Sequence, residues 1–294
     1  MARYAAPDLT GLTAPDVVEE LDYEVILDLL KTDITTRLES MGIDYDVASL
    51  ESDPVVKILE VAAYRETLLR ARVNTAARAI MLAYAQENDL DQLGVYYGVE
   101  RQITGYDADS NPIYETDTRL RTRIQLAPEA LSVAGPVGAY EFHAMSVDTT
   151  VKSVAVYSPD PGEVHVYPLV DTGDGTPSQS VLEKIQKKLA ETDIRPLTDM
   201  VQVMAPTKVA YTVDVSLEID EGPDEAVVKA AAAAAIQKYA DSRHIVATHV
   251  HLSGIIAAAH VSGVVSVTVN SPTADVEPKD NEFAYMSALT VAIV

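Results

Sequence analysis

Apolar residues recur every three or four positions along two stretches of the first hundred residues, the spacing that places side chains on one face of an α-helix. The first stretch follows Ala14-Pro15-Asp16 and predicts a helix over residues 15–40. The second follows Ser52-Asp53-Pro54, where a capping residue precedes a proline suited to the first helical turn. It predicts the longest helix of the chain, over residues 54–86.

The apolar positions of this second helix form one continuous seam. They step by three or four residues, which is typical of a helix in a bundle, and they are Val55, Leu59, Ala62, Leu69, Val73, Ala76, Ile80 and Ala83. A seam of this kind needs a partner. The partner could be the helix over residues 15–40, giving a hairpin, or helices of other chains, and the pattern leaves both open.

The stretch after the long helix is more polar. Residues 88–94 predict a short helix closed by Gly94, and residues 96–101 a compact corner. Residues 103–118 contain Gly105, Pro112 and four acidic side chains including Glu115, so they predict an exposed loop that is a candidate flexible element. A helix is expected to resume at Leu120.

From Val151 onward the pattern changes to short apolar runs separated by turn residues. Runs near 151–156 and 164–170 flank a Pro-Asp-Pro-Gly turn and predict a strand pair. Further elements follow, namely helices at 179–191, 224–241 and 252–261 and strands near 200–205, 208–219 and 264–269. The fold class is therefore α+β, with long N-terminal helices followed by mixed α+β domains. The expected divisions are 1–100 helical, 101–150 loop and helical connector, 151–206 α+β and 207–294 α+β.

The charge of the chain narrows the choice of partners. The 45 acidic and 22 basic residues give a net charge of −23, which opposes direct nucleic-acid binding and favours a basic protein partner. Fifteen tyrosines accompany only two phenylalanines and no tryptophan. Because tyrosine combines an apolar ring with a polar end, this usage suits partly buried contact surfaces.

Cysteine usage and hydropathy bear on compartment. There is no cysteine, which excludes disulfides, thiol catalysis and cysteine-ligated metals. The first residues lack the apolar core of a signal peptide, and no run approaches the ~20 apolar residues that span a bilayer. We expect synthesis in the cytoplasm and no membrane insertion.

Two acidic motifs invite a functional interpretation. Leu169-Val170-Asp171-Thr172-Gly173 resembles an aspartic protease loop, but that chemistry needs two carboxylates and the motif occurs once, so a polar turn is favoured. Asp107-Ala108-Asp109-Ser110-Asn111 begins like a calcium loop. Pro112 occupies the position that needs glycine and Thr118 the position that needs glutamate, which favours an exposed acidic loop.

A histidine pair and an arginine cluster each allow a functional and a structural interpretation. His249 and His251 would share one face of a strand, with His244 near in sequence, and could form half of a metal site. No nearby carboxylate completes it, so a strand-edge or interface role is favoured. Arg119, Arg121 and Arg123 form a basic patch or, more simply, a solvated helix face.

No catalytic, cofactor-binding or metal-ligating residue is therefore assigned, and we expect a protein that is not an enzyme. Two alternatives stay open. One is a metal-dependent hydrolase that uses the His249 and His251 pair. The other is a soluble acidic adaptor protein that binds a basic partner.

Several segments, taken in their order along the chain, resemble the baseplate J-like family of contractile-tailed phages and tail-like bacteriocins. They extend over nearly the whole chain. They are Ala14–Asp22, Tyr64–Glu66, Arg72–Ala79, Asn88–Gly94, Leu131–Tyr140 and Ile194–Asp199. The resemblance implies a structural wedge component of the tail baseplate. Two copies would join a smaller wedge protein, and wedges would close into a ring around the hub, in contact with sheath-initiator and fibre-bearing baseplate proteins.

The resemblance also implies where the contacts lie. The long N-terminal helices would enter an intermolecular bundle, and residues 207–294 would form a lateral-contact domain. The candidate interface residues are Val55, Leu59, Leu69, Val73 and Ile80. The protein would be made in the host cytoplasm, take its place in the tail baseplate, and help relay the trigger for sheath contraction.

Overall fold

The computed structural model describes residues 9, 12–13, 15, 19, 21–45, 52–132, 134–220, 222 and 224–294. The chain divides into two compact units, one spanning Pro7–Tyr96 and the other including Tyr97–Val294. The secondary structure is α+β, as the sequence predicts. In the part of the chain that the structure describes, every helix is too short or too polar to cross a lipid bilayer.

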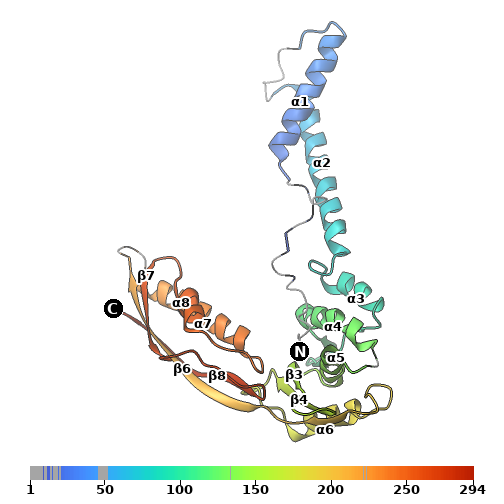
Figure 1. The fold of residues 1–294 in the computed structure, drawn as a ribbon. Helices are drawn as coiled ribbons and strands as arrows, with labels where there is room; N and C mark the ends of the chain where they lie inside the picture. Colours follow the sequence, from blue (N-terminus) through green and yellow to red (C-terminus); the bar gives the residue numbers. More distant parts are fainter. Residues whose placement is uncertain are drawn as a thin grey trace. The chain divides into compact units, whose positions relative to one another are not determined.

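The first unit contains three helices, and the first two lie side by side (Figure 1). They are α1 (Tyr23–Ser40), α2 (Pro54–Ala79) and α3 (Glu87–Val95). The carboxylates of Asp22 and Asp53 accept hydrogen bonds from the first backbone N–H groups of α1 and α2. These caps satisfy donors that have no partner inside the helix, which explains where both helices begin.

Both predicted boundaries of the long helices need correction. Pro15, Glu19 and Leu21 are described and are not helical, so α1 begins at Tyr23 and not near Pro15, while residues 14, 16–18 and 20 lie outside the described residues. At the other end, α2 stops at Ala79, not at residue 86. The backbone of Ile80 has ψ near 0°, and the Met81 N–H bonds to the Arg78 carbonyl three residues back, so the α-helical ladder ends there.

The second unit begins with a hairpin and two helices. Strands β1 (Ile103–Tyr106) and β2 (Pro112–Tyr114) pair antiparallel, and α4 (Asp117–Ala130) and α5 (Val137–Val147) follow. The predicted loop over 103–118 is therefore a β-hairpin, and the helix resumes at Asp117 rather than Leu120. The Thr116 hydroxyl caps α4, and the loop prediction failed because glycine and proline also fit a short exposed hairpin.

Next comes a three-stranded sheet with helices against it. β3 (Val151–Tyr157) pairs antiparallel with β4 (Glu163–Val170), and β4 pairs parallel with β5 (Met200–Val203) across the crossover helix α6 (Gln179–Leu189). The core combines residues of α5, α6 and all three strands. It includes Tyr140, Ala144, Val154, Val166, Ile185, Leu189 and Val201.

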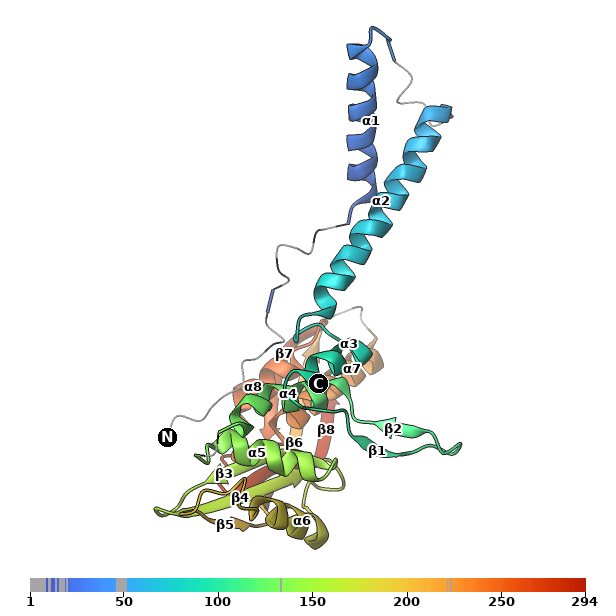
Figure 2. The same cartoon turned by 90° about the vertical axis from the view of Figure 1, so that its right-hand side faces the viewer.

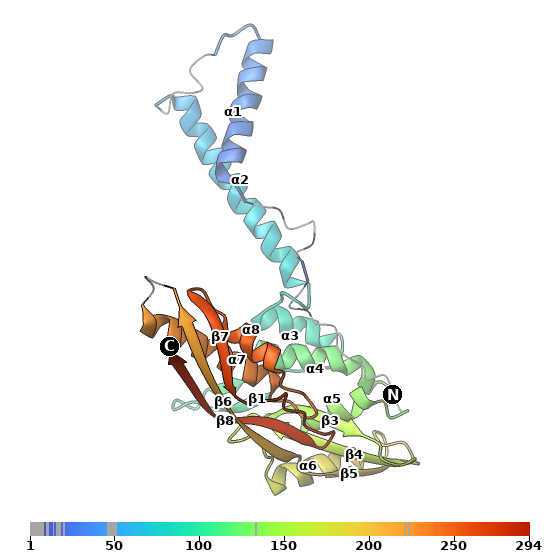
Figure 3. The same cartoon turned by 60° about the vertical axis from the view of Figure 1, so that its left-hand side comes forward.

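A second three-stranded sheet has the long strand β6 at its centre. β6 (Thr207–Ile219) pairs antiparallel with β7 (Val264–Ser271) and parallel with β8 (Glu282–Ile293). Helices α7 (Glu225–Arg243) and α8 (Leu252–Ala259) lie beside this sheet (Figure 3), and the core between them includes Val215, Leu217, Ala232, Ile236 and Ile255. Alanines of α7 let its backbone approach the sheet closely.

A small cluster joins the two sheets. Tyr167 and Leu169 of β4 pack with Val246 and with Phe283 of β8, and Leu169 and Phe283 have no exposed surface. At the rim of this joint Lys208 donates to the Asp174 carboxylate over 2.7 Å. The two predicted α+β portions therefore share apolar contacts and an ion pair.

Candidate assembly interface

The α1–α2 hairpin buries one face of each helix. Ile26 and Leu27 of α1 pack against Ala63 of α2, and Ala63 is fully buried. Leu59 is packed at the edge of this cluster. Because alanine has the smallest apolar side chain, it allows the two backbones to come close, and the contact depends on its size.

A polar contact extends the hairpin beyond α1. The side-chain amide of the buried Asn74 donates to the Glu19 carbonyl over 2.8 Å and accepts from the Glu19 N–H over 3.1 Å. Arg70 pairs with the carboxylates of Glu19 and Glu66 at 2.9 and 2.6 Å. These bonds hold Glu19 against α2, because Asn74 satisfies both of its backbone groups.

The structure places the five candidate interface residues in two settings. Leu59 belongs to the contact with α1 and Val55 is half-buried, whereas Leu69, Val73 and Ile80 are 65, 56 and 74% exposed. The predicted single seam is therefore divided between a face that meets α1 and a face that is open within the chain. At about 100° per residue, Val73 and Asn74 point to these two different faces.

The open face of α2 is larger than the sequence seam alone suggests. Leu69 and Val73 are four residues apart and so share one side of α2, and Ile80 follows seven residues later as the residue that ends the helix. Ile58 and Val61 extend the apolar surface toward the start of α2 and are also exposed, at 68 and 63%. We call the set Ile58, Val61, Leu69, Val73 and Ile80 the α2 stripe. Exposed apolar side chains on one side of a helix are typical of protein contact sites.

In the second unit, a buried ionic cluster stands where the sequence suggested solvated side chains. Glu115 is fully buried and accepts from Arg119 and Arg123, and Arg101 pairs with Asp117 at 2.7 Å. Arg119 also donates to the carbonyls of residues 145 and 148, near the end of α5. Burial lowers the pKa of the Arg123 guanidinium, a shift that the nearby carboxylate of Glu115 opposes.

These positions correct two predictions. Glu115 is not part of an exposed acidic loop, and Arg119 and Arg123 do not form a solvated face or a surface patch. A signal was present in the sequence, because Glu115, Arg119 and Arg123 recur every four residues and so fall on one side of a helical turn. The pattern indicates mutual pairing, but it does not reveal that α5 covers the cluster.

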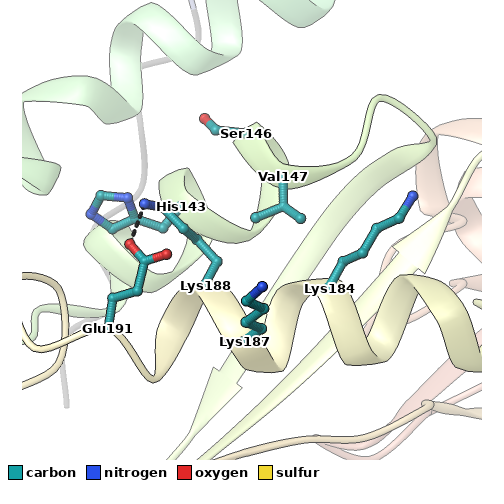
Figure 4. Close-up of a pocket in the computed structure, with 7 residues that line it drawn as sticks. All are labelled: His143, Ser146, Val147, Lys184, Lys187, Lys188 and Glu191. Atoms are coloured by element: carbon teal, nitrogen blue, oxygen red, sulfur yellow. Dashed lines mark hydrogen bonds and ion pairs between the residues drawn. The ribbon is translucent and has the colours of Figure 1, made fainter.

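A pocket opens between α5 and α6 (Figure 4). Its volume is about 370 Å³, and its walls are His143, Ser146, Val147, Lys184, Lys187, Lys188 and Glu191. Lys184 pairs with Asp148 at 2.9 Å and Lys188 pairs with Glu191. Burial, and secondarily Lys188, lowers the pKa of His143. No motif in the sequence marks this group of lysines.

The histidine pair lies at the start of α8. The rings of His249 and His251 are 6.0 Å apart between centroids, and His251 Nδ1 lies 2.7 Å from Asp275 Oδ2. The expectation that no carboxylate lies near was wrong, since Asp275 is close in space although distant in sequence. Its other oxygen accepts from the Leu252 N–H, so this carboxylate caps α8. Among the described residues, no group of three or more potential ligands could hold a metal ion.

Other predicted motifs have local structural roles. Asp107 accepts from the backbone N–H groups of Asp109 and Asn111 and thereby holds the hairpin turn. Asp171 is exposed, and its N–H donates to the Thr150 carbonyl. The His244 ring lies near the rings of Phe283 and Tyr285 at the joint between the two sheets. Its ring contacts therefore differ from those of His249 and His251.

The α2 stripe, the hairpin and the lysine pocket are surface features that suit contacts with other proteins. Family comparisons specify the class of protein. Baseplate J-like N-terminal, central and C-terminal domains match residues 51–106, 132–205 and 211–292. The chain belongs to the baseplate J-like family and is a structural baseplate component.

A phage relative agrees with this membership. Baseplate protein J of Escherichia phage P2 is 41% identical over 276 residues, which cover 92% of this chain and 91% of that protein. Among solved structures, a chain of the cryo-EM structure of the anti-feeding prophage baseplate, 6-fold symmetrised, aligns with a TM-score of 0.40 and 16% identity. That alignment covers 61% of this chain and 42% of the other.

Proposed function

We propose that this chain is a wedge component of a contractile tail. Two copies join a smaller wedge protein, and the wedges close into a ring around the central hub. The observation that carries the proposal is the α2 stripe, because it leaves large apolar side chains in solvent after α1 has taken its own face of the helix. Family membership supports the baseplate as the place of assembly.

The α2 stripe suits a shared helical bundle. Helix α2 presents one apolar side to α1 and a second to solvent, so further helices are needed to cover it. Helices of the second copy and of the smaller wedge protein are the proposed cover. Val55, Leu69, Val73 and Ile80 would lie at this contact, while Leu59 would support it from the α1 side.

The remaining partners follow from the same proposal. The hub, sheath-initiator and fibre-bearing baseplate proteins would contact the ring, and residues 207–294 would provide lateral contacts. Direct nucleic-acid binding is opposed by the net charge of −23. Assembly would take place in the host cytoplasm, and the mature particle would carry the chain in its tail baseplate.

Relay of the trigger for sheath contraction would require ring contacts with two alternative arrangements. The candidate flexible element over 103–118 contains a hairpin with a hydrogen-bonded turn and a base that adjoins the Glu115 cluster, so it would move as a folded unit. Any rearrangement would then occur at contacts between chains.

The alternative functions make different predictions. A hydrolase based on His249 and His251 would need a third metal ligand, whereas Asp275 is engaged with His251 and the α8 backbone. Purified chain free of stoichiometric metal would dismiss it. An acidic adaptor would bind a basic protein without forming ring-sized complexes of fixed stoichiometry.

Substitution of one stripe residue tests the proposed bundle. Val73→Asp places a charge in the stripe and should abolish co-purification with the wedge partners, because burying an unpaired carboxylate is costly. The free chain should remain folded, since Val73 is exposed there. Thr75→Asp, on another exposed side of α2, is the matched control. Intact wedges with Val73→Asp would contradict the bundle proposal.

A further inference from the structure

Residues 103–114 form a projecting hairpin that we call the arm. Figure 2 shows it extending away from α4 and α5. Large apolar side chains on it are exposed, including Tyr106 at 66% and Tyr114 at 51%. The Asp107 carboxylate accepts from the N–H groups of Asp109 and Asn111 and from the Asn111 side chain, so the tip has a defined turn.

The arm is held firmly at its base. An isolated two-stranded hairpin is marginally stable in water, so an ordered one needs support from its surroundings. Here the Gln102 N–H donates to the buried Glu115 carboxylate, and the Glu115 N–H donates to the Gln102 carbonyl. Glu115 is itself clamped by Arg119 and Arg123. A buried cluster thus fixes the root of an element whose outer side chains contact solvent.

The lysine pocket, defined by the seven lining residues between α5 and α6, has the opposite character. It gathers Lys184, Lys187 and Lys188 in a chain that has only 22 basic residues against 45 acidic ones. Lys184 and Lys188 have carboxylate partners. Lys187 is exposed, and within the described ranges no ion pair of this lysine is found. Val147 and the lysine stems supply apolar surface beside these charges.

We propose that the arm of one copy docks in the lysine pocket of a second copy. The arm and its flanks, residues 102–118, contain no lysine or arginine, and its tip offers Asp107 and Asp109 beside the ring of Tyr106. Because Asp107 is occupied with the turn, Asp109 is the carboxylate that meets Lys187. Tyr106 packs over the lysine stems, where cations and aromatic faces attract each other.

This contact joins two different surfaces, one from each copy. Such a heterologous contact repeats from chain to chain and produces a ring when the rotation closes. It deepens the proposed wedge function, on which it rests, because it names a direct link between neighbouring copies. It is separate from the α2 stripe, which belongs to the other structural unit.

The absence of native cysteine allows a direct test in assembled particles. One chain carries Asp109→Cys and a second, differently tagged chain carries Lys187→Cys, and both are produced together in the host. Any disulfide between the two tags must join separate copies. The control pairs Asp109→Cys with Ser158→Cys, an exposed turn position between β3 and β4.

Docking should raise the cross-linked yield roughly tenfold above the control pair, because a bound arm holds the two thiols at high effective concentration. Particles that contain both chains with a yield equal to the control would overturn the docking and leave the wedge function standing. Particles from which both chains are missing would overturn the two proposals together.

Charge reversal separates docking from incidental proximity. Asp109→Lys or Lys187→Glu alone should lower ring formation, and the two reversals combined should restore it, because the ion pair is rebuilt with opposite polarity. Failure of the double variant to recover would contradict the assigned pair. Thermal unfolding of each free variant should match the wild type, since both side chains are exposed.

Discussion

Glu115 shows how one side chain can hold a whole element in place. It is fully buried, accepts from two arginines, and also receives the Gln102 N–H at the root of the arm. Replacing it by Gln would leave the buried guanidinium of Arg123 and the partly buried one of Arg119 without this compensating charge. We expect Glu115→Gln to reduce the free energy of unfolding by about 3 kcal/mol.

Denaturant unfolding of the full chain measures this effect. Asp109→Asn, at the exposed tip of the same hairpin, serves as the control and should change stability by less than about 0.5 kcal/mol. Equal stability of the two variants would show that the Glu115 cluster does not anchor the fold.

Asn74 gives a second prediction at the residue scale. Its amide bonds both backbone groups of Glu19, and Asn74→Ala would leave that N–H and carbonyl unsatisfied or hydrated. The expected loss is about 1–2 kcal/mol. Urea unfolding should show it, with Thr75→Ala on the exposed side of α2 as the reference. If Asn74→Ala left the free energy of unfolding unchanged, this side chain would not hold Glu19 against α2.

The ion pair of Asp174 and Lys208 predicts a pH dependence. The hydrogen bond from Lys208 lowers the pKa of Asp174 below its ordinary value of 3.8. The stabilising contribution is therefore complete above that value and is lost as the pH falls toward the lower folded-state pKa. The Tm difference between wild type and Asp174→Asn should be constant at neutral pH and shrink below about pH 4. A Tm difference that stays constant below about pH 4 would contradict this role of the ion pair.

At the residue scale, the sequence indicates which side chains can pair better than it indicates where they lie in the fold. The spacing of Glu115, Arg119 and Arg123 contained the information for pairing, yet only the packing of α5 makes the cluster buried. The pairing of His251 with Asp275 joins residues 24 apart, with α8 and β7 between them, and no local pattern predicts it. The lysine pocket likewise requires α5 and α6 to be neighbours.

At the scale of elements, the contact of α1 with α2 depends on a small residue. Ala63→Leu adds three carbon atoms where Ala63 is fully buried against Ile26 and Leu27. The overpacked hairpin should lose about 1–3 kcal/mol. Hydrogen exchange of the α1 amides should accelerate accordingly. Ala62→Leu, one position along on the exposed side, should leave exchange unchanged, and equal rates in both variants would rule out this packing.

Hydrophobic periodicity predicted most of the elements, because an amphipathic pattern is visible within one segment without knowledge of its neighbours in space. Strands β3, β4, β6 and β7 fall near their predicted positions, and α1 and α2 lie within their longer predicted ranges. Helix α5 was not assigned, since it has no polar face and contains Gly138. Strand β8 was also missed, because its pairing with β6 comes from the distant residues 207–217 and not from a local turn.

At the scale of the whole molecule, the strongest sequence evidence was the resemblance, and family membership is confirmed. The pattern left open whether α2 pairs within the chain or between chains. The structure shows the pairing within the chain, since α1 covers one face of α2, and it leaves the other face exposed. The wedge contacts themselves stay a proposal, because they involve other chains.

The most direct measurement of the central claim is electron microscopy of purified particles that carry this chain with a tag in the exposed turn at Ser158. Gold label against the tag should gather at the tail tip, in a ring around the hub, and should be lost when Val73→Asp prevents incorporation. Label along the sheath or at another part of the particle, or complete baseplates that lack the chain, would contradict its assignment as a wedge component.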